Sequence, residues 1–438
     1  MPSALSERLG AALAGSPLLP RLATAVEPLV ERRAADPAAA ALDGAPLRGV
    51  ARALAASAES ARYLSLRPAL FARLAALEPG TLERRAAELD AVALPDPASA
   101  LEDFLDGLRL LRRDEMLFAA VAHLSGLASF DAVSTFLSRL AESCAERALA
   151  AAEGRAPGVP GVLAVLGMGK LASREFTYHS DLDVIFLFRD DAPDALRPSR
   201  IAQRWISNLT TMTGAGFVYH VDSRLRPSGQ QGALVTTHEA FARYQIEQAA
   251  TWEHVALLRA RAVAGDVARA QRGLETARDA ICRAAANPWR YLADMRGRVV
   301  AERGVEDAKK LALKAGRGGI MDVEFLAAGA LLERGLQLGG DALPAVPAML
   351  RTAAAGPRIE ALLRDYAFLR RVEASARWLA GRAVETLATG SESWAQLADL
   401  VAPGQPIARL APALAAARER IATRFDAVCA KETIDALV

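Results

Sequence analysis

Two aspartates separated by one residue stand at the start of an apolar run, in the segment Ser180-Asp181-Leu182-Asp183. The run itself, residues 182–188, is rich in branched and aromatic side chains and predicts a buried strand. Side chains two apart on a strand project to the same side, so Asp181 and Asp183 would lie side by side. Adjacent carboxylates repel unless a cation neutralises them, and such hard oxygen ligands suit Mg²⁺ or Mn²⁺. The alternative is a solvated turn ahead of the strand.

A third carboxylate, Asp222, ends another predicted strand over residues 217–221, and Arg224 and Arg226 follow it at alternate positions. Alternation places these three side chains on one side if the strand continues that far. If the two strands are neighbours, three carboxylates and two guanidiniums converge, and the carboxylates must lie within about 8 Å to share coordination. Such a group can hold two divalent ions while the arginines bind phosphate oxygens. The plainer interpretation is a surface network of ion pairs.

A glycine-lysine turn, Gly167-Met168-Gly169-Lys170, directly follows the first predicted strand, residues 161–166. Glycines let backbone amides approach a phosphate, and Lys170 can neutralise its charge. Leu171 stands where a Walker A loop needs Ser or Thr, which excludes that motif. The glycine spacing also imitates a dinucleotide-binding fingerprint, but the aspartates follow too soon to leave room for a full helix and a strand.

The charge balance excludes several classes of partner. Of 438 residues, 53 are Lys or Arg and 51 are Asp or Glu, so the net charge is only +2. Residues 161–270 contain 12 Lys or Arg and 11 Asp or Glu, which offers no basic track for a nucleic acid and argues against an RNA-directed nucleotidyltransferase. No apolar run approaches the roughly 18 residues of a membrane span. We therefore expect no nucleic-acid and no membrane partner.

The three cysteines, Cys144, Cys282 and Cys429, are widely spaced and odd in number, which favours small buried side chains in a reducing compartment. The N-terminal residues carry Glu7 and Arg8 and lack the apolar core of a signal peptide. A cytoplasmic location is the expectation.

The chain divides into three predicted regions. Residues 1–156 have helical spacing interrupted by prolines and end in a Pro/Gly-rich linker. Residues 157–270 contain the predicted strands, with helical spacing over 198–212 and again over 237–264, and form the predicted catalytic domain. Residues 271–438 read mostly as helix. The predicted fold class is α+β and helix-rich, with a small mixed sheet between an N-terminal helical region and a C-terminal helical bundle.

A strand, a glycine-lysine turn, a two-aspartate strand and a third aspartate strand are together similar to the nucleotidyltransferase superfold. The chain resembles one family in particular, the glutamine synthetase adenylyltransferases. The resemblance covers about residues 100–390 and rests on ordered motifs at 111–117, 166–171, 178–187, 221–229, 251–254, 258–266 and 318–325.

Members of this family carry two related halves, one adding AMP and one removing it, and this chain is about as long as one half. It is most similar to the transferring half, on the basis of Ser228, His254 and the pair Asp322 and Glu324. The removing half and a catalytically silent regulatory protein are the alternatives. Two departures from the family pattern are Ala172-Ser173, in place of a glycine pair, and Ala328, where glutamine is common.

The resemblance implies transfer of AMP from ATP to a tyrosine hydroxyl of glutamine synthetase, with release of pyrophosphate. It implies Mg²⁺ (or Mn²⁺) as cofactor, ATP as substrate, glutamine synthetase as protein partner and a PII-type signalling protein as regulator. Asp181, Asp183 and Asp222 would be the catalytic metal ligands, with Asp222 nearest the acceptor. The nucleotide-binding residues would be Gly167, Gly169, Lys170, Ser180, Arg224 and Arg226. Supporting roles fall to Glu253, Arg259, Arg261, Asp322 and Glu324, and each of these also has a purely structural alternative.

Overall fold

A computed structural model of the chain describes residues 4–33, 36–284, 287–338 and 342–437. The N-terminal region is helical as predicted. Its short helices are α1 (Ala4–Ala12), α2 (Leu19–Ala25), α3 (Glu27–Arg33), α4 (Pro37–Ala40), α5 (Gly44–Ala56), α6 (Ala58–Ser65), α7 (Ala69–Ala75) and α8 (Thr81–Glu88). Two long helices follow, α9 (Leu101–Leu124) and α10 (Phe130–Glu153).

Local sequence sets the ends of several of these helices. Ser129 caps α10, because its hydroxyl accepts a hydrogen bond from the Ala132 amide, and Gly154 ends the helix with a φ of 70°. Pro37 opens α4 behind the Asp36 cap, as suits a residue with no amide hydrogen to leave unpaired. Proline therefore marks a helix start there as well as a break.

The small sheet lies in the middle of the chain and contains β1 (Leu163–Met168), β2 (Leu182–Phe188), β3 (Val221–Asp222), β4 (Val235–Thr237) and β5 (Ala260–Gly265). Its order is β3-β2-β1-β5, and β4 also pairs with β2. β1 runs antiparallel to β2 and β5, whereas β3 and β4 run parallel to β2. The predicted mixed sheet is confirmed.

Two parts of the sequence-based assignment were wrong. Residues 260–265 were expected to be helical but form β5, because pairing with β1 buries this alanine-rich segment and overrides its local helical propensity. The strand expected over 217–221 is reduced to Val221 and Asp222, preceded by an irregular segment whose Phe217 ring stacks on His220.

Both faces of the sheet are covered, so alternate strand residues enter different cores. Val165, Val184 and Phe186 belong to a core shared with α9, α10 and α12 (Leu196–Thr210). Leu166 and Ile185 belong to a second core shared with the C-terminal helices. Burial on both faces explains why β1 and β2 read as continuous apolar runs.

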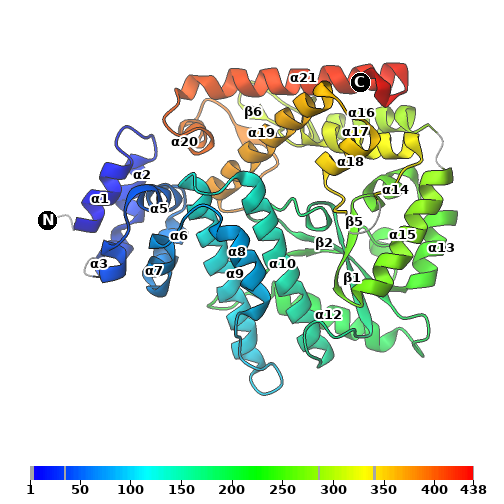
Figure 1. The fold of residues 1–438 in the computed structure, drawn as a ribbon, viewed down its shortest axis with the longest axis horizontal. Coiled ribbons are helices and arrows are strands. Elements are labelled where there is room, and N and C mark those ends of the chain that lie inside the picture. Colours follow the sequence, from blue (N-terminus) through cyan, green and yellow to red (C-terminus); the bar gives the residue numbers. More distant parts are fainter. Residues whose placement is uncertain (1–3, 34–35, 285–286, 339–341, 438) are drawn as a thin grey trace.

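The remaining helices surround the second core. They are α11 (Gly169–Ala172), α13 (His238–Glu247), α14 (Thr251–Leu257), α15 (Val267–Ala284), α16 (Trp289–Arg303), α17 (Ile320–Arg334), α18 (Val346–Ala353), α19 (Pro357–Ala380), α20 (Glu392–Val401) and α21 (Leu410–Lys431). The strands β6 (Lys310–Leu311) and β7 (Leu387–Ala388) pair in antiparallel fashion and form a separate two-stranded sheet. In Figure 1 the N-terminal helices gather at the left and α21 runs along the top. Within the described ranges, no helix is both long and apolar enough to cross a membrane.

Candidate active site

Asp183 and Asp222 are partners across the parallel pair β2 and β3. Neighbouring strands lie about 4.8 Å apart, and in-register residues point to the same face. The turn after β1 closes on the same place, since a Cβ built on Gly169 would lie 4.0 Å from Asp183 Oδ2. The two strands are therefore neighbours, which is the condition under which Asp183 and Asp222 were expected to lie close together.

The electrostatics of Asp183 reflect this crowding. Burial, together with the negative charges of Asp222 and Asp181, raises the pKa of Asp183 to about 6, against the opposing effects of Lys314 and Lys170. Asp181 itself precedes the strand and is exposed. A carboxylate held in this way is costly to ionise, and a cation placed beside it would remove that cost.

Asp222 is engaged with its neighbour Arg224. The Arg224 guanidinium donates to both carboxylate oxygens, with Nε at 2.8 Å from Oδ2, and the Arg224 amide donates to Oδ1 at 2.9 Å. These hydrogen bonds from Arg224 lower the pKa of Asp222, although partial burial acts in the opposite direction. The two paired aspartates therefore have pKa values displaced in opposite directions.

The donor chemistry fits a divalent cation, because three carboxylates lie near one edge and the half-buried Asp183 makes no ion pair with any described residue. In the arrangement observed, however, the described residues contain no group of three or more His, Cys, Asp or Glu side chains placed to hold a metal ion. The predicted shared metal site stays a prediction.

The glycine-lysine turn is built differently from the sequence-based expectation. Gly167 lies inside β1 and allows close packing, since a Cβ there would meet Val263 at 2.9 Å. Gly169 has a φ of 51°, and its amide donates to the Arg259 carbonyl at 2.8 Å. The predicted amide cradle is thus reduced to a turn that packs beside Asp183.

Lys170 is not free. Its ammonium lies 2.5 Å from Glu373 Oε1, a residue of α19. Burial lowers the pKa of Lys170 to about 7, and the field of Glu373 opposes that shift. Burial would raise the pKa of Glu373, but Lys170, Arg370 and Arg377 together outweigh it and hold that pKa well below its usual range.

Ser180 is buried at the base of the turn before β2. Its hydroxyl accepts a hydrogen bond from the Thr177 amide at 3.1 Å and another from Arg377 at 3.4 Å. His179 next to it has a φ of 54°, a conformation uncommon outside glycine. Ser180 therefore fixes the position of Asp181 and does not present its hydroxyl to solvent.

The residues expected to support the site form buried ion pairs. Arg259 contacts Glu175 at 2.8 Å and Glu324 at 2.6 Å, and these two carboxylates outweigh burial and raise its pKa. Arg261 pairs with Glu142. Asp322 pairs with Arg296 and accepts a hydrogen bond from the Gly318 amide at 2.7 Å, so it holds the glycine turn ahead of α17. None of these charges is uncommitted.

Glu253 and Arg226 also have structural partners. Glu253 accepts hydrogen bonds from the Tyr244 hydroxyl at 2.8 Å and from the Ala250 amide at the start of α14. Arg226 donates to the carbonyls of Ser223, Gln230 and Gly232 and thereby closes the loop after β3. His254, which also prompted the comparison with the transferring half, bonds the Gln245 carbonyl.

Two hollows meet at the carboxylates. The first has a volume of about 410 Å³ and is lined by residues of the loop after β3. The second has a volume of about 360 Å³, and its lining includes Arg112, Phe217 and Arg382. Asp181 and His220 line both cavities. Sequence reasoning missed Arg112, Glu373 and Arg377. Only the motif at 111–117 hinted at the first, and nothing local hinted at the other two.

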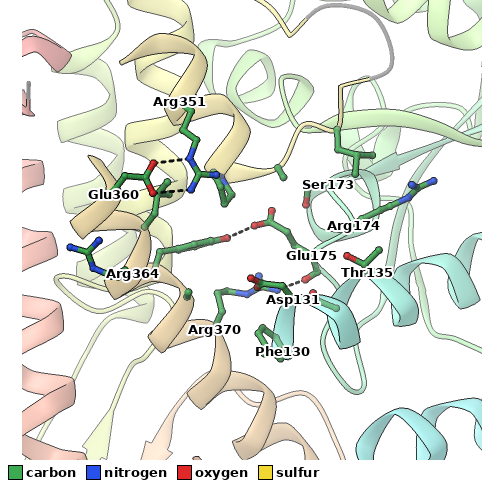
Figure 2. A pocket seen from close by; sticks show the side chains of 17 residues that line it. Phe130, Asp131, Thr135, Ser173, Arg174, Glu175, Arg351, Glu360, Arg364 and Arg370 are labelled. Atoms are coloured by element: carbon green, nitrogen blue, oxygen red, sulfur yellow. Dashed lines mark hydrogen bonds and ion pairs between the residues drawn. The ribbon is translucent and has the colours of Figure 1, made fainter. Parts of the chain in front are cut away.

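A third cavity is separate from the carboxylates. Figure 2 shows this space of about 400 Å³ between the start of α10, the turn at Ser173–Glu175 and helices α18 and α19. Tyr366 and Glu175 both line it, and the Tyr366 hydroxyl donates to Glu175 Oε1 at 3.0 Å. Because Glu175 also pairs with Arg259, this cavity borders the far end of the same ion-pair network.

Residues 47–276, slightly more than half of the chain, match the family described as glutamate-ammonia ligase adenylyltransferase. The chain belongs to this adenylyltransferase family. Residues 293–429 match a second family, described as GlnD PII-uridylyltransferase, so the helical C-terminal region also has relatives among nucleotidyltransferases.

Individual relatives agree with this assignment to the adenylyltransferase family. A bifunctional glutamine synthetase adenylyltransferase/adenylyl-removing enzyme from Thioalkalivibrio sulfidiphilus is 37% identical over 61% of this chain and 30% of its own length. The protein of the same name from Chromobacterium violaceum is 35% identical over 68% of this chain and 35% of its own. The chain thus spans about a third of the length of the curated relatives it matches.

Proposed function

We propose that this chain transfers AMP from ATP to a tyrosine hydroxyl of glutamine synthetase and releases pyrophosphate. The observation that carries the proposal is the register pairing of Asp183 with Asp222 beside the Gly169 turn, in a member of the adenylyltransferase family. Burial, with the neighbouring carboxylates of Asp222 and Asp181, raises the pKa of Asp183, and a carboxylate in such surroundings suits a site that works with Mg²⁺ or Mn²⁺.

The carboxylates of Asp181, Asp183 and Asp222 would hold the cation. When bound, a divalent cation lowers the pKa of an attacking hydroxyl and stabilises the leaving phosphate. The tyrosine oxygen would form a bond to the α-phosphorus as the bond to the bridging oxygen breaks, and pyrophosphate leaves with that electron pair. Asp222, nearest the acceptor by family resemblance, would take the hydroxyl proton once Arg224 moves from Asp222 to a phosphate oxygen.

The remaining predicted ligands would act around the phosphates. Gly169 keeps backbone close to Asp183, and Ser180 holds the turn that presents Asp181. Lys170 would contact a phosphate through its remaining N–H groups or by leaving Glu373, which neutralises its charge. Arg226 would act indirectly, because it keeps the loop that carries Arg224 closed.

The test is incubation of the purified chain with α-labelled ATP, Mg²⁺ and glutamine synthetase. We expect label on a tyrosine, and we expect Asp183→Asn to reduce it at least about a thousandfold. Asp191→Asn is the matched control, since Asp191 is exposed beyond the other end of β2 and pairs with Arg189, and it should transfer normally. Transfer by a folded Asp183→Asn protein at the wild-type rate would disprove the assignment.

The same assay separates the alternatives. Phosphate-dependent release of AMP from pre-modified synthetase would identify the removing half. Label on RNA would show a different acceptor, and no label with either acceptor would indicate a silent protein. Addition of a PII-type protein to the assay tests the regulator that the family resemblance implies.

A further inference from the structure

Lys314, on the turn ahead of α17, stands out among the cations near the carboxylates. Lys170 is paired with Glu373, Arg259 with Glu175 and Glu324, and Arg224 with Asp222. In the part of the chain that the structure describes, the Lys314 ammonium makes no hydrogen bond and no ion pair. It is also one of only five lysines in 438 residues. A half-buried cation without a partner is available to a ligand.

The backbone of Lys314 is held firmly. Its carbonyl accepts a hydrogen bond from the Met321 amide at 3.1 Å, in the first turn of α17. The glycines that follow are sterically required: Gly318 has a φ of 70°, and a Cβ there would lie 2.0 Å from the Arg418 carbonyl oxygen. Arg296 donates to the Gly316 carbonyl at 2.6 Å and pairs with Asp322, which fastens the turn from the other side.

A continuous set of contacts links this turn to the carboxylates. Glu324, one turn into α17, pairs with Arg259, whose carbonyl accepts the Gly169 amide hydrogen, and Gly169 packs beside Asp183. The positive charge of Lys314 affects residues along this path. It opposes the effect of burial on the pKa of Asp183, and it contributes to the lowering of the pKa of Glu324 and of Lys170. These electrostatic effects agree with the position of the turn, whose Lys314 carbonyl is hydrogen-bonded to the first turn of α17.

We propose that Lys314 binds the triphosphate of the nucleotide, at the β- and γ-phosphates, and stabilises the pyrophosphate as it leaves. This inference rests on the proposed function and assigns to Lys314 the role that the sequence suggested for Lys170. A rigid turn that presents one unpaired ammonium beside a carboxylate edge is suited to bind a triphosphate that carries a divalent cation. The ammonium would contact the phosphate oxygens and the carboxylates would contact the cation. Lys170 then serves mainly as a buried partner of Glu373 that fixes the glycine turn.

The experiment compares binding of an ATP analogue with a methylene group between the α- and β-phosphorus, and of AMP, by isothermal titration calorimetry with Mg²⁺. We expect Lys314→Met to weaken the analogue about 10- to 100-fold, as for the loss of one charge-assisted contact, and to change AMP binding less than about twofold. Lys314→Arg should recover most of the affinity. The matched control is Lys309→Met, five residues earlier and exposed, which should bind both as the wild type does.

An unchanged analogue affinity in Lys314→Met, or an equal loss for analogue and AMP, would overturn the assignment. Lys314→Gln keeps the test available if the methionine variant does not fold. The transfer assay tests the proposed reaction separately from the triphosphate site. If Lys314→Met weakens binding of the analogue as expected but the wild type labels no synthetase, the proposed reaction fails and the triphosphate site stands. If transfer occurs and Lys314→Met supports it with an unchanged KM for ATP, the reaction stands and the triphosphate site fails.

Discussion

The ammonium of Lys170 lies 2.5 Å from the carboxylate of Glu373, so the turn after the first strand is tied to a helix 203 residues further along the chain. Arg370 and Arg377 approach the same carboxylate, at 3.6 Å and 3.2 Å, and all four side chains are largely or wholly buried. Arg377 also reaches Ser180. One carboxylate of α19 therefore organises both the glycine turn and the start of β2.

Glu373→Gln should destabilise the protein by about 3–5 kcal/mol, because it leaves three buried cations without their shared partner. Urea denaturation followed by circular dichroism measures this change. Glu360→Gln on the same helix is the control: Glu360 pairs with Arg351 at the surface, and its loss should leave the midpoint unchanged. Equal midpoints for Glu373→Gln and the wild type would mean that the cluster does not hold the turn.

Asp183 should make the protein less stable as pH rises. Its folded-state pKa of about 6 exceeds the ordinary value of 3.8, so the folded state holds the proton more tightly and stability falls between about pH 4 and pH 7. Relative to the wild type, Asp183→Asn should gain about 3 kcal/mol of stability across that window. Thermal denaturation at a series of pH values measures it.

Asp222→Asn is the comparison with the opposite sign. Arg224 lowers the pKa of Asp222, so that carboxylate stabilises the folded state above its unfolded pKa, and the contribution is lost as the pH falls through the lower folded value.

Addition of Mg²⁺ at pH 7 should raise the melting temperature of the wild type and not that of Asp183→Asn. A pH profile that is the same for Asp183→Asn and the wild type would contradict the crowded-carboxylate interpretation.

Much of the carboxylate edge could be predicted because its signals are local. The apolar run of branched and aromatic residues over 182–188 predicted the strand correctly, and Asp183 and Asp222 are in register. β5 was missed because its alanine-rich segment has a local propensity for helix, whereas its conformation is decided by pairing with β1.

The charged partners could not be predicted, for a different reason. Arg259 is two residues from Arg261, and the family resemblance gives both a supporting role at the site, yet their carboxylate partners come from α10, α17 and the turn at Ser173–Glu175. Which arginine is neutralised depends on contacts between distant segments. Lys314 was not predicted as a site residue, because the sequence around it does not reveal that its ammonium lacks a partner among the described residues.

Arg226 should hold the loop over residues 223–232 closed. Arg226→Lys loses the fork of donors that reaches three carbonyls, so the loop should open more often and be cleaved by a protease at least about tenfold faster. Limited proteolysis with mass spectrometry locates the cut. Arg224→Lys in the same loop should not speed cleavage, because Arg224 bonds Asp222 and not the loop carbonyls. Faster cleavage in both variants, or in neither, would refute this role.

Arg224 should act in opposite directions on cation binding and on catalysis. Its guanidinium occupies both oxygens of Asp222, so Arg224→Gln should free that carboxylate and, without nucleotide, bind Mn²⁺ about three- to tenfold more tightly. The same variant should transfer AMP more slowly, because a cation near the α-phosphate is lost. Electron paramagnetic resonance titration of Mn²⁺ and the labelled-ATP assay give the two numbers. Arg189→Gln removes an exposed arginine from a comparable local pair with Asp191 and should change neither. Weaker Mn²⁺ binding by Arg224→Gln would show that Arg224 does not compete with the cation for Asp222.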